Sequence, residues 1–343
     1  MRATIKDVAK AAGVSPSTVS LIINERPVPI SKDTREKVMK AVNDLHYRPN
    51  QLAVGLVTNT TNTIGLILPD SNNPFFAALS NQLESRLRHE HLNVIIGNTG
   101  GDPEVTRQYL HIFSDRRVDG IILAQMDFED EAETTKCREL LKSIDIPIVY
   151  VDRVADDGNH FSVEVNQVQI GYLATRHLLE LGHRQIGCAS GSIRLNVNAC
   201  RYLGYRMALE EYGLAADPSL LFCDSLSITC GQKALPCLLG QNVSAIFAFN
   251  DMIAYGIYKE CRNYNLSIPR DLSVIGVDDI FLSDIIYPPL TTVAQPVSEI
   301  AARAVDGMLH LLQDPQNRTD TAKLNPILKV RGSTARVCPP PHV

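Results

Sequence analysis

Residues 4–24 read TIKDVAKAAGVSPSTVSLIIN, and this stretch predicts two short helices joined by a tight turn. Thr4 and Asp7 form a helix-start signature, because a hydroxyl and a carboxylate at this spacing satisfy backbone N–H groups at the helix end. Gly13 supplies the left-handed residue that ends the first helix. Ser15 then precedes Pro16, which suits the first position of a second helix because the missing proline N–H costs nothing there.

The second helix has two unlike faces. Val19, Ile22 and Ile23 share one side, which we expect to be buried. The opposite side carries small hydrogen-bonding groups and one leucine: Ser17, Thr18, Ser20, Leu21 and Asn24. Such a short helix does not stand alone in water, and its small polar groups suit insertion into a groove. Helix-turn-helix units insert their second helix into the major groove of DNA, so we expect DNA binding; an ordinary helical hairpin in a core is the alternative.

A third helix and a linker follow. Ser31 begins this helix, with an inward stripe of Val38, Ala41, Val42 and Leu45. Three helices in about 45 residues form the minimal closed helix-turn-helix domain. Pro49 disfavours a helix through the preceding residue. Asn50 then caps a short segment that runs to Leu56, and a stretch rich in threonine and asparagine follows as a linker.

From residue 63 onward, apolar strands alternate with amphipathic helices. The predicted strands are IGLILP (64–69), NVIIGN (93–98), DGIILA (119–124), IPIVYVD (146–152), IGCASG (186–191), AIFAFN (245–250) and SVIGVD (273–278). Strands buried on both faces with helical crossovers predict parallel sheets in an α/β fold, and seven units exceed one comfortable sheet. We therefore expect two lobes, with a small-molecule site between them at the carboxyl ends of the strands.

Motifs along nearly the whole chain closely resemble the lactose/purine repressor family of bacterial transcription regulators. They are TIKDVAKAAGVSPSTVS, TREKVMKAVNDLHYRPN, NQLAVGLVTNTTNTIGLILPD, VDGIIL, HLLELGHRQIG, AIFAFNDMIAYG, IGVDDI, YPPLTTVAQP and VRGST. The resemblance implies an all-α helix-turn-helix headpiece with a hinge helix, followed by a two-lobed periplasmic-binding-protein type I fold. The expected domains are 1–48 (DNA binding), 49–61 (hinge helix and linker) and 62–337 (effector binding and dimerisation). Lobe one would hold about 62–162 and 292–324, and lobe two about 163–291 and 325–337.

The resemblance also implies how DNA would be read. Pro16, Ser17 and Leu21 occupy base-reading positions, and Leu21 would make an apolar contact such as one with a thymine methyl. Leu56 matches the leucine that the family wedges into the minor groove, and Gly55 beside it costs the hinge helix roughly 1 kcal/mol relative to alanine. The expected DNA-binding residues are Thr4, Ser15, Pro16, Ser17, Thr18, Ser20, Leu21, Asn24, Tyr47, Asn50 and Leu56.

The candidate ligands at or near strand ends are Asp70 to Phe76, Asp152 and Arg153, Asn250 and Asp251, Asp278 and Asp279, and Arg201 on a following helix. The family resemblance implies that six of them border the effector: Phe75, Phe76, Asp152, Arg201, Asn250 and Asp278. Their carboxylate, amide and guanidinium groups suit vicinal hydroxyls or ring nitrogens, and the two phenylalanines suit an apolar ring face. Asp70 and Asp251 are expected to be helix caps instead, and Arg201 has a structural pairing with Asp278 as its alternative. The chain has Leu226 where related proteins carry a stacking aromatic, and it contains no tryptophan. A sugar or sugar derivative is the first expectation, and a purine or other metabolite acting as corepressor is the second.

Charge is distributed unevenly along the chain. Residues 1–60 carry nine Lys and Arg residues against five Asp and Glu residues, whereas the whole chain carries 33 against 38. A basic head on an acidic body places the phosphate-attracting field at one end. Two reading heads imply a homodimer on a near-palindromic operator. The tail TARVCPPPHV has no heptads, so a coiled coil that builds tetramers is not expected.

Other function classes lack their signatures. No G-x-G-x-x-G follows the first strand, and the chain has no phosphate loop and no H-E-x-x-H, so we expect neither an enzyme nor a cofactor. The first residues enter a polar, capped helix and no apolar run approaches 18 residues, so we expect no export signal and no membrane span. A solute-binding protein would share the body fold but would need the export signal. The eight cysteines are expected to be buried free thiols, without metal, in a cytoplasmic, nucleoid-associated protein.

Overall fold

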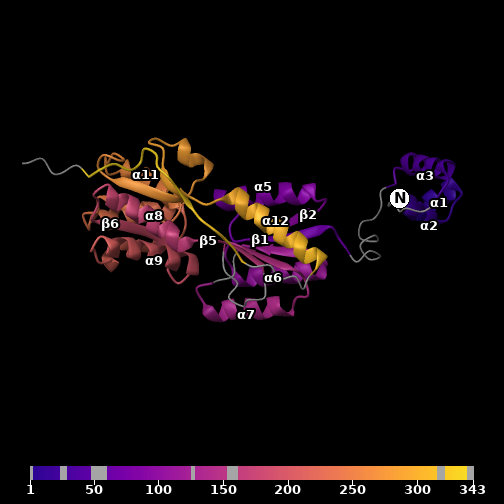
Figure 1. Cartoon of the computed structure of the whole chain (residues 1–343), viewed down its shortest axis with the longest axis horizontal. Helices are drawn as coiled ribbons and strands as arrows, with labels where there is room; N and C mark the ends of the chain where they lie inside the picture. Colours follow the sequence, from indigo (N-terminus) through magenta and orange to yellow (C-terminus); the bar gives the residue numbers. More distant parts are fainter. Residues whose placement is uncertain are drawn as a thin grey trace, which may run out of the picture. The chain divides into compact units, whose positions relative to one another are not determined.

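A computed structural model describes residues 3–23, 29–47, 60–124, 128–152, 161–314 and 321–337. The chain divides into two compact units, Met1–Thr61 and Asn62–Val343, and each is described by itself. Figure 1 shows the helices of the first unit and the two α/β layers of the second.

The first unit is a three-helix headpiece made of α1 (Ile5–Ala12), α2 (Pro16–Ile23) and α3 (Lys32–Asp44). Thr4 and Asp7 form the expected reciprocal cap, and Gly13 ends α1 in the left-handed region with φ 66°. The small core that the three helices share consists of Val8, Ala9, Val19, Ile22, Val38 and Ala41. Leu45 was predicted to face inward and does not: it follows the end of α3 and is 37% exposed.

The second unit contains, among its described residues, two six-stranded sheets. The strands are β1 (Thr63–Leu68), β2 (Asn93–Asn98), β3 (Gly120–Leu123), β4 (Ile148–Val151), β5 (Phe161–Val165), β6 (Ile186–Gly191), β7 (Leu221–Asp224), β8 (Ala245–Ala248), β9 (Ser273–Asp278), β10 (Thr291–Ala294), β11 (Ala322–Leu324) and β12 (Ile327–Lys329). The helices are α5 (Pro74–His89), α6 (Pro103–Asp115), α7 (Glu131–Ser143), α8 (Gln167–Glu180), α9 (Asn196–Glu211), α10 (Ile228–Leu239), α11 (Asp251–Cys261) and α12 (Val297–Gln313), with 3₁₀ turns η1 (Pro218–Leu220) and η2 (Phe281–Asp284).

The first sheet has the order β11-β5-β4-β3-β1-β2, and all its neighbours are parallel. Successive side chains of a strand point to opposite faces. Leu66 therefore packs in one core with α5 and α12, whereas Ile67 packs in another with α6 and α7. Figure 1 shows these helix pairs on the two faces of the sheet.

The second sheet has the order β12-β10-β9-β8-β6-β7. Its neighbours are parallel except for the edge strand β12, which pairs with β10 in the antiparallel sense. Phe247 faces the core shared with α8 and α9, and Ile246 faces the core shared with α10 and α11. The chain passes between the sheets three times: after β5, after β10, and between β11 and β12.

The seven predicted strands all form, but the expectation of burial on both faces is wrong for one of them. NVIIGN is β2, an edge strand with one neighbour, and Ile95 and Ile96 are exposed. Strands β5, β7, β10, β11 and β12 were not predicted. The last two have three residues each, too short for a periodic signal.

Candidate functional site

A cavity of about 320 Å³ lies between the two sheets, at the carboxyl ends of their strands. Asp152 directly follows β4, Asp278 ends β9, and Asn250 lies two residues beyond β8. The structure brings all six predicted effector residues to this one cavity: Phe75, Phe76, Asp152, Arg201, Asn250 and Asp278. This agrees with the rule that parallel α/β sheets place ligands at these strand ends.

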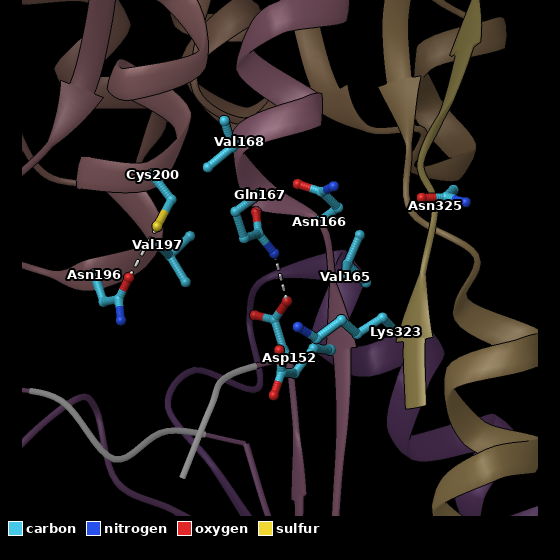
Figure 2. A pocket seen from close by; sticks show the side chains of 11 residues that line it. Asp152, Val165, Asn166, Gln167, Val168, Asn196, Val197, Cys200, Lys323 and Asn325 are labelled. Carbon is cyan, nitrogen blue, oxygen red and sulfur yellow. Dashed lines mark hydrogen bonds between the residues drawn. The ribbon is translucent and has the colours of Figure 1, made fainter. Parts of the chain in front are cut away.

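Two buried carboxylates stand on opposite lobes of the cavity. Asp152 accepts a hydrogen bond from Gln167 Nε2 at 3.1 Å, which Figure 2 shows, and Asp278 accepts one from Gln295 Nε2 at 2.8 Å. Both aspartates have left-handed backbones, with φ 70° and φ 108°, a region that non-glycine residues rarely adopt. Strained backbone at a strand end is common at binding sites, because it aims a side chain that an ordinary strand would not.

Arg201 is the positive charge beside these carboxylates. It is buried, and its Nε donates to Gln167 Oε1 at 2.9 Å while Nη1 donates to the Phe249 carbonyl oxygen. Gln167 therefore links Arg201 to Asp152 through its amide. Within the described residues, the hydrogen bonds of Arg201 go to Gln167 and the Phe249 carbonyl oxygen and not to Asp278, so the alternative of a structural ion pair is not supported.

Close packing of α8 against α9 places Arg201. A Cβ on Gly171 would lie 1.9 Å from the Arg201 carbonyl oxygen, and one on Gly204 would lie 1.9 Å from the Val168 carbonyl oxygen. Only glycine permits this approach of the two helix backbones. The guanidinium of α9 thereby reaches the first turn of α8, where Gln167 stands.

Burial dominates the electrostatics of the pair. It raises the pKa of Asp152 to about 7 and that of Asp278 to about 6, because a desolvated carboxylate favours the neutral form. The nearby Arg201 guanidinium opposes both shifts, and Asp278 further raises the pKa of Asp152. Both groups thus titrate close to neutral pH.

The other predicted residues serve the cavity wall in different ways. Phe75 and Phe76 begin α5 and contact each other edge to face at 5.1 Å between ring centroids, which gives the wall an apolar corner. Asn250 lines the cavity, but its side chain is already engaged: Oδ1 caps α11 at the Ile253 N–H, and Nδ2 donates to the Leu226 carbonyl oxygen. These two hydrogen bonds hold that part of the wall in place.

Neither of the two expected helix caps is one. Asp70 accepts from the Asn72 N–H in the loop before α5, whose cap is Asn73, and Asp70 lines the cavity. Asp251 is fully buried and accepts from the Ile280 N–H, Ser283 Oγ and Thr292 Oγ1, so it ties α11 to the segment after β9 and to β10.

Three cavity-side amides were missed by the sequence reasoning: Gln167, Asn198 and Gln295. Gln295 directly follows β10, and Gln167 stands two residues after β5. The strand-end rule finds both once these strands are known, but neither strand was predicted. Asn198 lies on the first turn of α9, a position that gave no signal.

A second cavity of about 440 Å³ adjoins the first and shares Asp152 and Val197 with it. Figure 2 shows it between β5, the amino ends of α8 and α9, and the stretch of chain that carries Lys323 on β11 and Asn325 just after it. Its described lining includes one lysine, Lys323, and one further carboxylate, Glu164. Asp152 therefore lies on the wall of both cavities.

The headpiece presents most of the predicted DNA-binding residues on α2 and its cap. Ser15 Oγ caps α2 at the Thr18 N–H, and Pro16 and Ser17 are exposed. Thr18, Ser20 and Leu21 are half-buried on the side away from Val19. Thr4 caps α1 and Tyr47 packs partly against the headpiece core, so both have a structural role there. Asn24, Asn50 and Leu56 lie outside the described residues.

No group of three or more His, Cys, Asp or Glu side chains in the described ranges is arranged to hold a metal ion. The seven cysteines in those ranges are free thiols; Cys223 and Cys237 are exposed rather than buried as expected. Among the same residues, no helix has both the length and the apolarity that a membrane span requires.

Comparisons with known proteins agree with this geometry. A family model described as bacterial regulatory proteins, lacI family, matches residues 4–50, and a periplasmic binding protein-like domain matches residues 175–334. The HTH-type transcriptional repressor PurR of Vibrio atlanticus is 36% identical over 339 residues, covering 96% of this chain and 98% of that protein.

Two solved structures extend the similarity to three dimensions. A LacI family transcriptional regulator from Enterococcus faecium with bound ribose is 30% identical, with a TM-score of 0.73 over 80% of this chain and 100% of that one. The lac repressor dimer bound to operator and the anti-inducer ONPF is 25% identical, with a TM-score of 0.87 over 98% and 100% of the two chains. With a helix-turn-helix headpiece, two parallel sheets and whole-length relatives, this chain is a member of the lacI family of bacterial regulatory proteins.

Proposed function

We propose that the protein is a transcriptional repressor that binds a near-palindromic operator as a homodimer and is switched by a small molecule in the 320 Å³ cavity. One observation carries the proposal: the same chain joins a reading helix, α2, to a body whose interlobe cavity collects all six predicted effector residues. We propose residues 1–48, 49–61 and 62–337 as the reading, hinge and effector domains.

The exposed side of α2 supports DNA reading. Pro16 and Ser17 are exposed at its amino end and Leu21 lies one turn further along, so the helix can enter a major groove end first. Short side chains allow the helix backbone to approach the base edges closely. We propose Asn24, Asn50 and Leu56 as DNA contacts on the family resemblance, with Leu56 as the minor-groove wedge.

The cavity supports a switch. Asp152 belongs to one lobe and Arg201 and Asp278 to the other, so a ligand that binds all three favours one lobe arrangement over another. Binding at the cavity and at the operator is then reciprocally coupled. The ribose bound by the relative from Enterococcus faecium favours a sugar or sugar derivative. A ligand that releases DNA is an inducer, and one that tightens it is a corepressor.

Exposed apolar side chains support the homodimer. Phe281 is 70% exposed and Tyr287 is 93% exposed, and Ile285 between them is exposed as well. Val330 is also exposed and precedes Arg331 in the chain. Arg331 donates to Asp279 at 2.6 Å and to the Leu290 carbonyl oxygen at 2.9 Å, which holds this segment beside residues 279–290. We call Phe281, Ile285, Tyr287 and Val330 the apolar patch. Large apolar groups gathered in this way mark an interaction surface, here for a second copy of the chain.

We further propose that the protein works without a cofactor and acts on DNA in the cytoplasm, at the nucleoid, because the operator of a transcription regulator is genomic DNA.

Selection of DNA by the full-length protein tests the proposal. Duplexes with a random central region are bound, recovered and sequenced, and the account predicts enrichment of sites with two inverted half-sites. The isolated residues 62–343 serve as the control and should enrich nothing. Absence of any enriched sequence with the full chain would remove the repressor function.

A further inference from the structure

The cavity offers more hydrogen-bond acceptors than donors, and this imbalance describes its ligand. The inference rests on the proposed function, since it concerns the effector of the same cavity. Four side-chain oxygens and one guanidinium nitrogen lack protein partners among the described residues: Asn198 Oδ1, Gln295 Oε1, Asp152 Oδ2, Asp278 Oδ2 and Arg201 Nη2.

The amide orientations are fixed by their neighbours. Asn198 Nδ2 donates to the Ser192 carbonyl oxygen at 2.9 Å, and Gln295 Nε2 donates to Asp278. Both neighbours are acceptors, so each amide must turn its NH₂ group toward them and its oxygen away. Asn198 is 1% exposed and Gln295 is 6% exposed, and neither oxygen has a partner within the described structure.

Buried oxygens without a hydrogen-bond partner lower the stability of the folded protein. A buried acceptor without a hydrogen bond costs about 1–3 kcal/mol, a deficit that a donor brought by a ligand removes. Both residues line the cavity wall. A small tilt of each side chain that keeps its NH₂ hydrogen bond to the Ser192 carbonyl oxygen or to Asp278 would bring the oxygen to a ligand donor.

The charged side chains add two more acceptors and one donor. Asp152 Oδ1 and Asp278 Oδ1 are occupied by the amides of Gln167 and Gln295, which leaves Oδ2 of each aspartate. Arg201 has committed Nε and Nη1 to Gln167 and the Phe249 carbonyl oxygen, which leaves Nη2. When both aspartates are ionised, unpartnered acceptors therefore outnumber unpartnered donors among the described buried side chains of the cavity, and a complementary ligand donates at several points.

The charge balance of the cavity is negative. Five carboxylates line it, Asp70, Glu129, Asp152, Asp224 and Asp278, against the single described cation Arg201. Lys233 pairs with Asp224 at 2.7 Å and neutralises one of them. Arg153 lies outside the described residues, and one further positive charge would leave the balance negative. An anionic ligand would meet net repulsion in a site of low dielectric.

We propose that the effector is an uncharged polyhydroxylated molecule of monosaccharide size, and that the cavity rejects phosphorylated or carboxylated derivatives and purine bases. Each hydroxyl supplies the donor that the four oxygens need, and one hydroxyl oxygen accepts from Arg201. A purine base carries its N–H donors in one plane, two in hypoxanthine and four in guanine, whereas the hydroxyls of a polyol point in several directions around the ring. The cavity volume of about 320 Å³ is at the small end of ligand sites, which suits one sugar ring.

Calorimetric titration of the full-length protein tests this inference. The probes are neutral aldoses, ketoses, polyols and cyclitols, the phosphate ester and the uronic acid of each, and hypoxanthine and guanine. We expect at least one neutral polyol to bind, and its phosphate ester to bind at least 100-fold more weakly. Tighter binding of an anionic probe or a purine, or no binding by any neutral probe, would overturn the inference.

Variants that remove the side-chain oxygens of Asn198 and Gln295 test whether these oxygens bind the ligand. Asn198→Leu and Gln295→Leu should each weaken binding of the neutral ligand about tenfold or more. Asn263→Leu, which changes an exposed asparagine outside both cavities, should leave that affinity unchanged. The double variant Asp70→Asn, Glu129→Gln should reduce the ratio between the affinities for the neutral ligand and for its phosphate ester at least tenfold. Equal affinities in Asn198→Leu, Gln295→Leu and the parent would contradict the assignment of these acceptors.

The same titrations repeated with the selected operator separate this inference from the proposed function. A purine or phosphate that binds and shifts operator affinity would refute the ligand class while leaving the switch intact. A neutral polyol that binds without any effect on operator affinity would support the ligand class and refute the switch.

Discussion

At the scale of single residues, two buried aspartates make the cavity sensitive to pH. Burial raises the pKa of Asp152 from its ordinary value of 3.8 to about 7 in the folded body, so the folded state binds more protons between these two pH values. The contribution of this group to the free energy of unfolding is therefore present at low pH and falls as pH rises toward 7. Asp278 acts in the same sense up to about pH 6.

Asp152→Asn tests this sign. The parent without ligand should lose stability between pH 5 and pH 8, and the variant should lose less, as measured by urea unfolding at both pH values. Asp271→Asn is the control, because the pKa of Asp271 is lowered to about 2 and the group is ionised throughout this window. A variant with the same pH 5 to pH 8 difference as the parent would show that Asp152 is not the titrating group.

Leu21 is the residue-scale feature that sets the headpiece apart from a purely polar reading helix. It lies half-buried on α2 and cannot donate or accept a hydrogen bond. Leu21→Arg should change the selected DNA sequence, because arginine prefers guanine O6 and N7 whereas leucine offers only apolar contact. Leu21→Met keeps the apolar contact and should retain the parental site. Selection of the same site by Leu21→Arg would mean that Leu21 does not read bases.

The cavity residues show which ligand-site positions can be predicted from the sequence and which cannot. Asp152, Asn250 and Asp278 follow apolar runs that are recognisable as strands, so a rule about strand ends finds them. Gln167 and Gln295 follow β5 and β10, whose threonine, serine and glutamate residues interrupt the apolar pattern. The unpaired oxygen of Asn198 depends on a contact with the Ser192 carbonyl group, and no sequence pattern encodes that contact.

At the scale of elements, the contact between α8 and α9 decides where Arg201 stands. Gly204→Ala would place a Cβ 1.9 Å from the Val168 carbonyl oxygen, so the helices must separate. We expect the free energy of unfolding to fall by about 1–3 kcal/mol and effector affinity to fall with it. Alanine is a better helix former than glycine, so helix propensity alone would predict a rise in the free energy of unfolding.

Gly240→Ala is the matched control for this substitution. Gly240 has an ordinary helical backbone, and its added Cβ would approach no atom closer than 3.4 Å. Chemical denaturation of both variants should therefore show a loss at Gly204 and at most about 0.5 kcal/mol of change at Gly240. Equal stability of the two variants would contradict the role assigned to the α8–α9 contact.

The sequence predicted the helix ends that capping residues mark, but it did not predict which strands lie at the edges of the sheets. The helix starts at Thr4 and Ser31 and the helix end at Gly13 are written in local capping chemistry, and all three form as expected. Strand β2 has the composition of a central strand but lies at an edge. Position in a sheet depends on distant partners, so a run of apolar residues does not fix it.

At the scale of the whole molecule, the apolar patch defined above is the surface that dimerisation would bury. Tyr287→Asp should weaken self-association at least tenfold in sedimentation equilibrium, because it places a charge where the partner chain would pack. Tyr264→Asp changes another exposed tyrosine outside the patch and should leave association unchanged. If Tyr287→Asp associates with the same constant as the parent, the dimer interface does not include the apolar patch.

The central claim is that one chain couples the interlobe cavity to operator DNA, and linkage tests it most directly. Operator affinity is measured with and without saturating effector, and effector affinity is measured with and without saturating operator. The account predicts a change in both, and the two ratios must be equal because coupling free energy is reciprocal. An effector that binds the cavity with the same affinity in the presence and absence of operator would contradict the account.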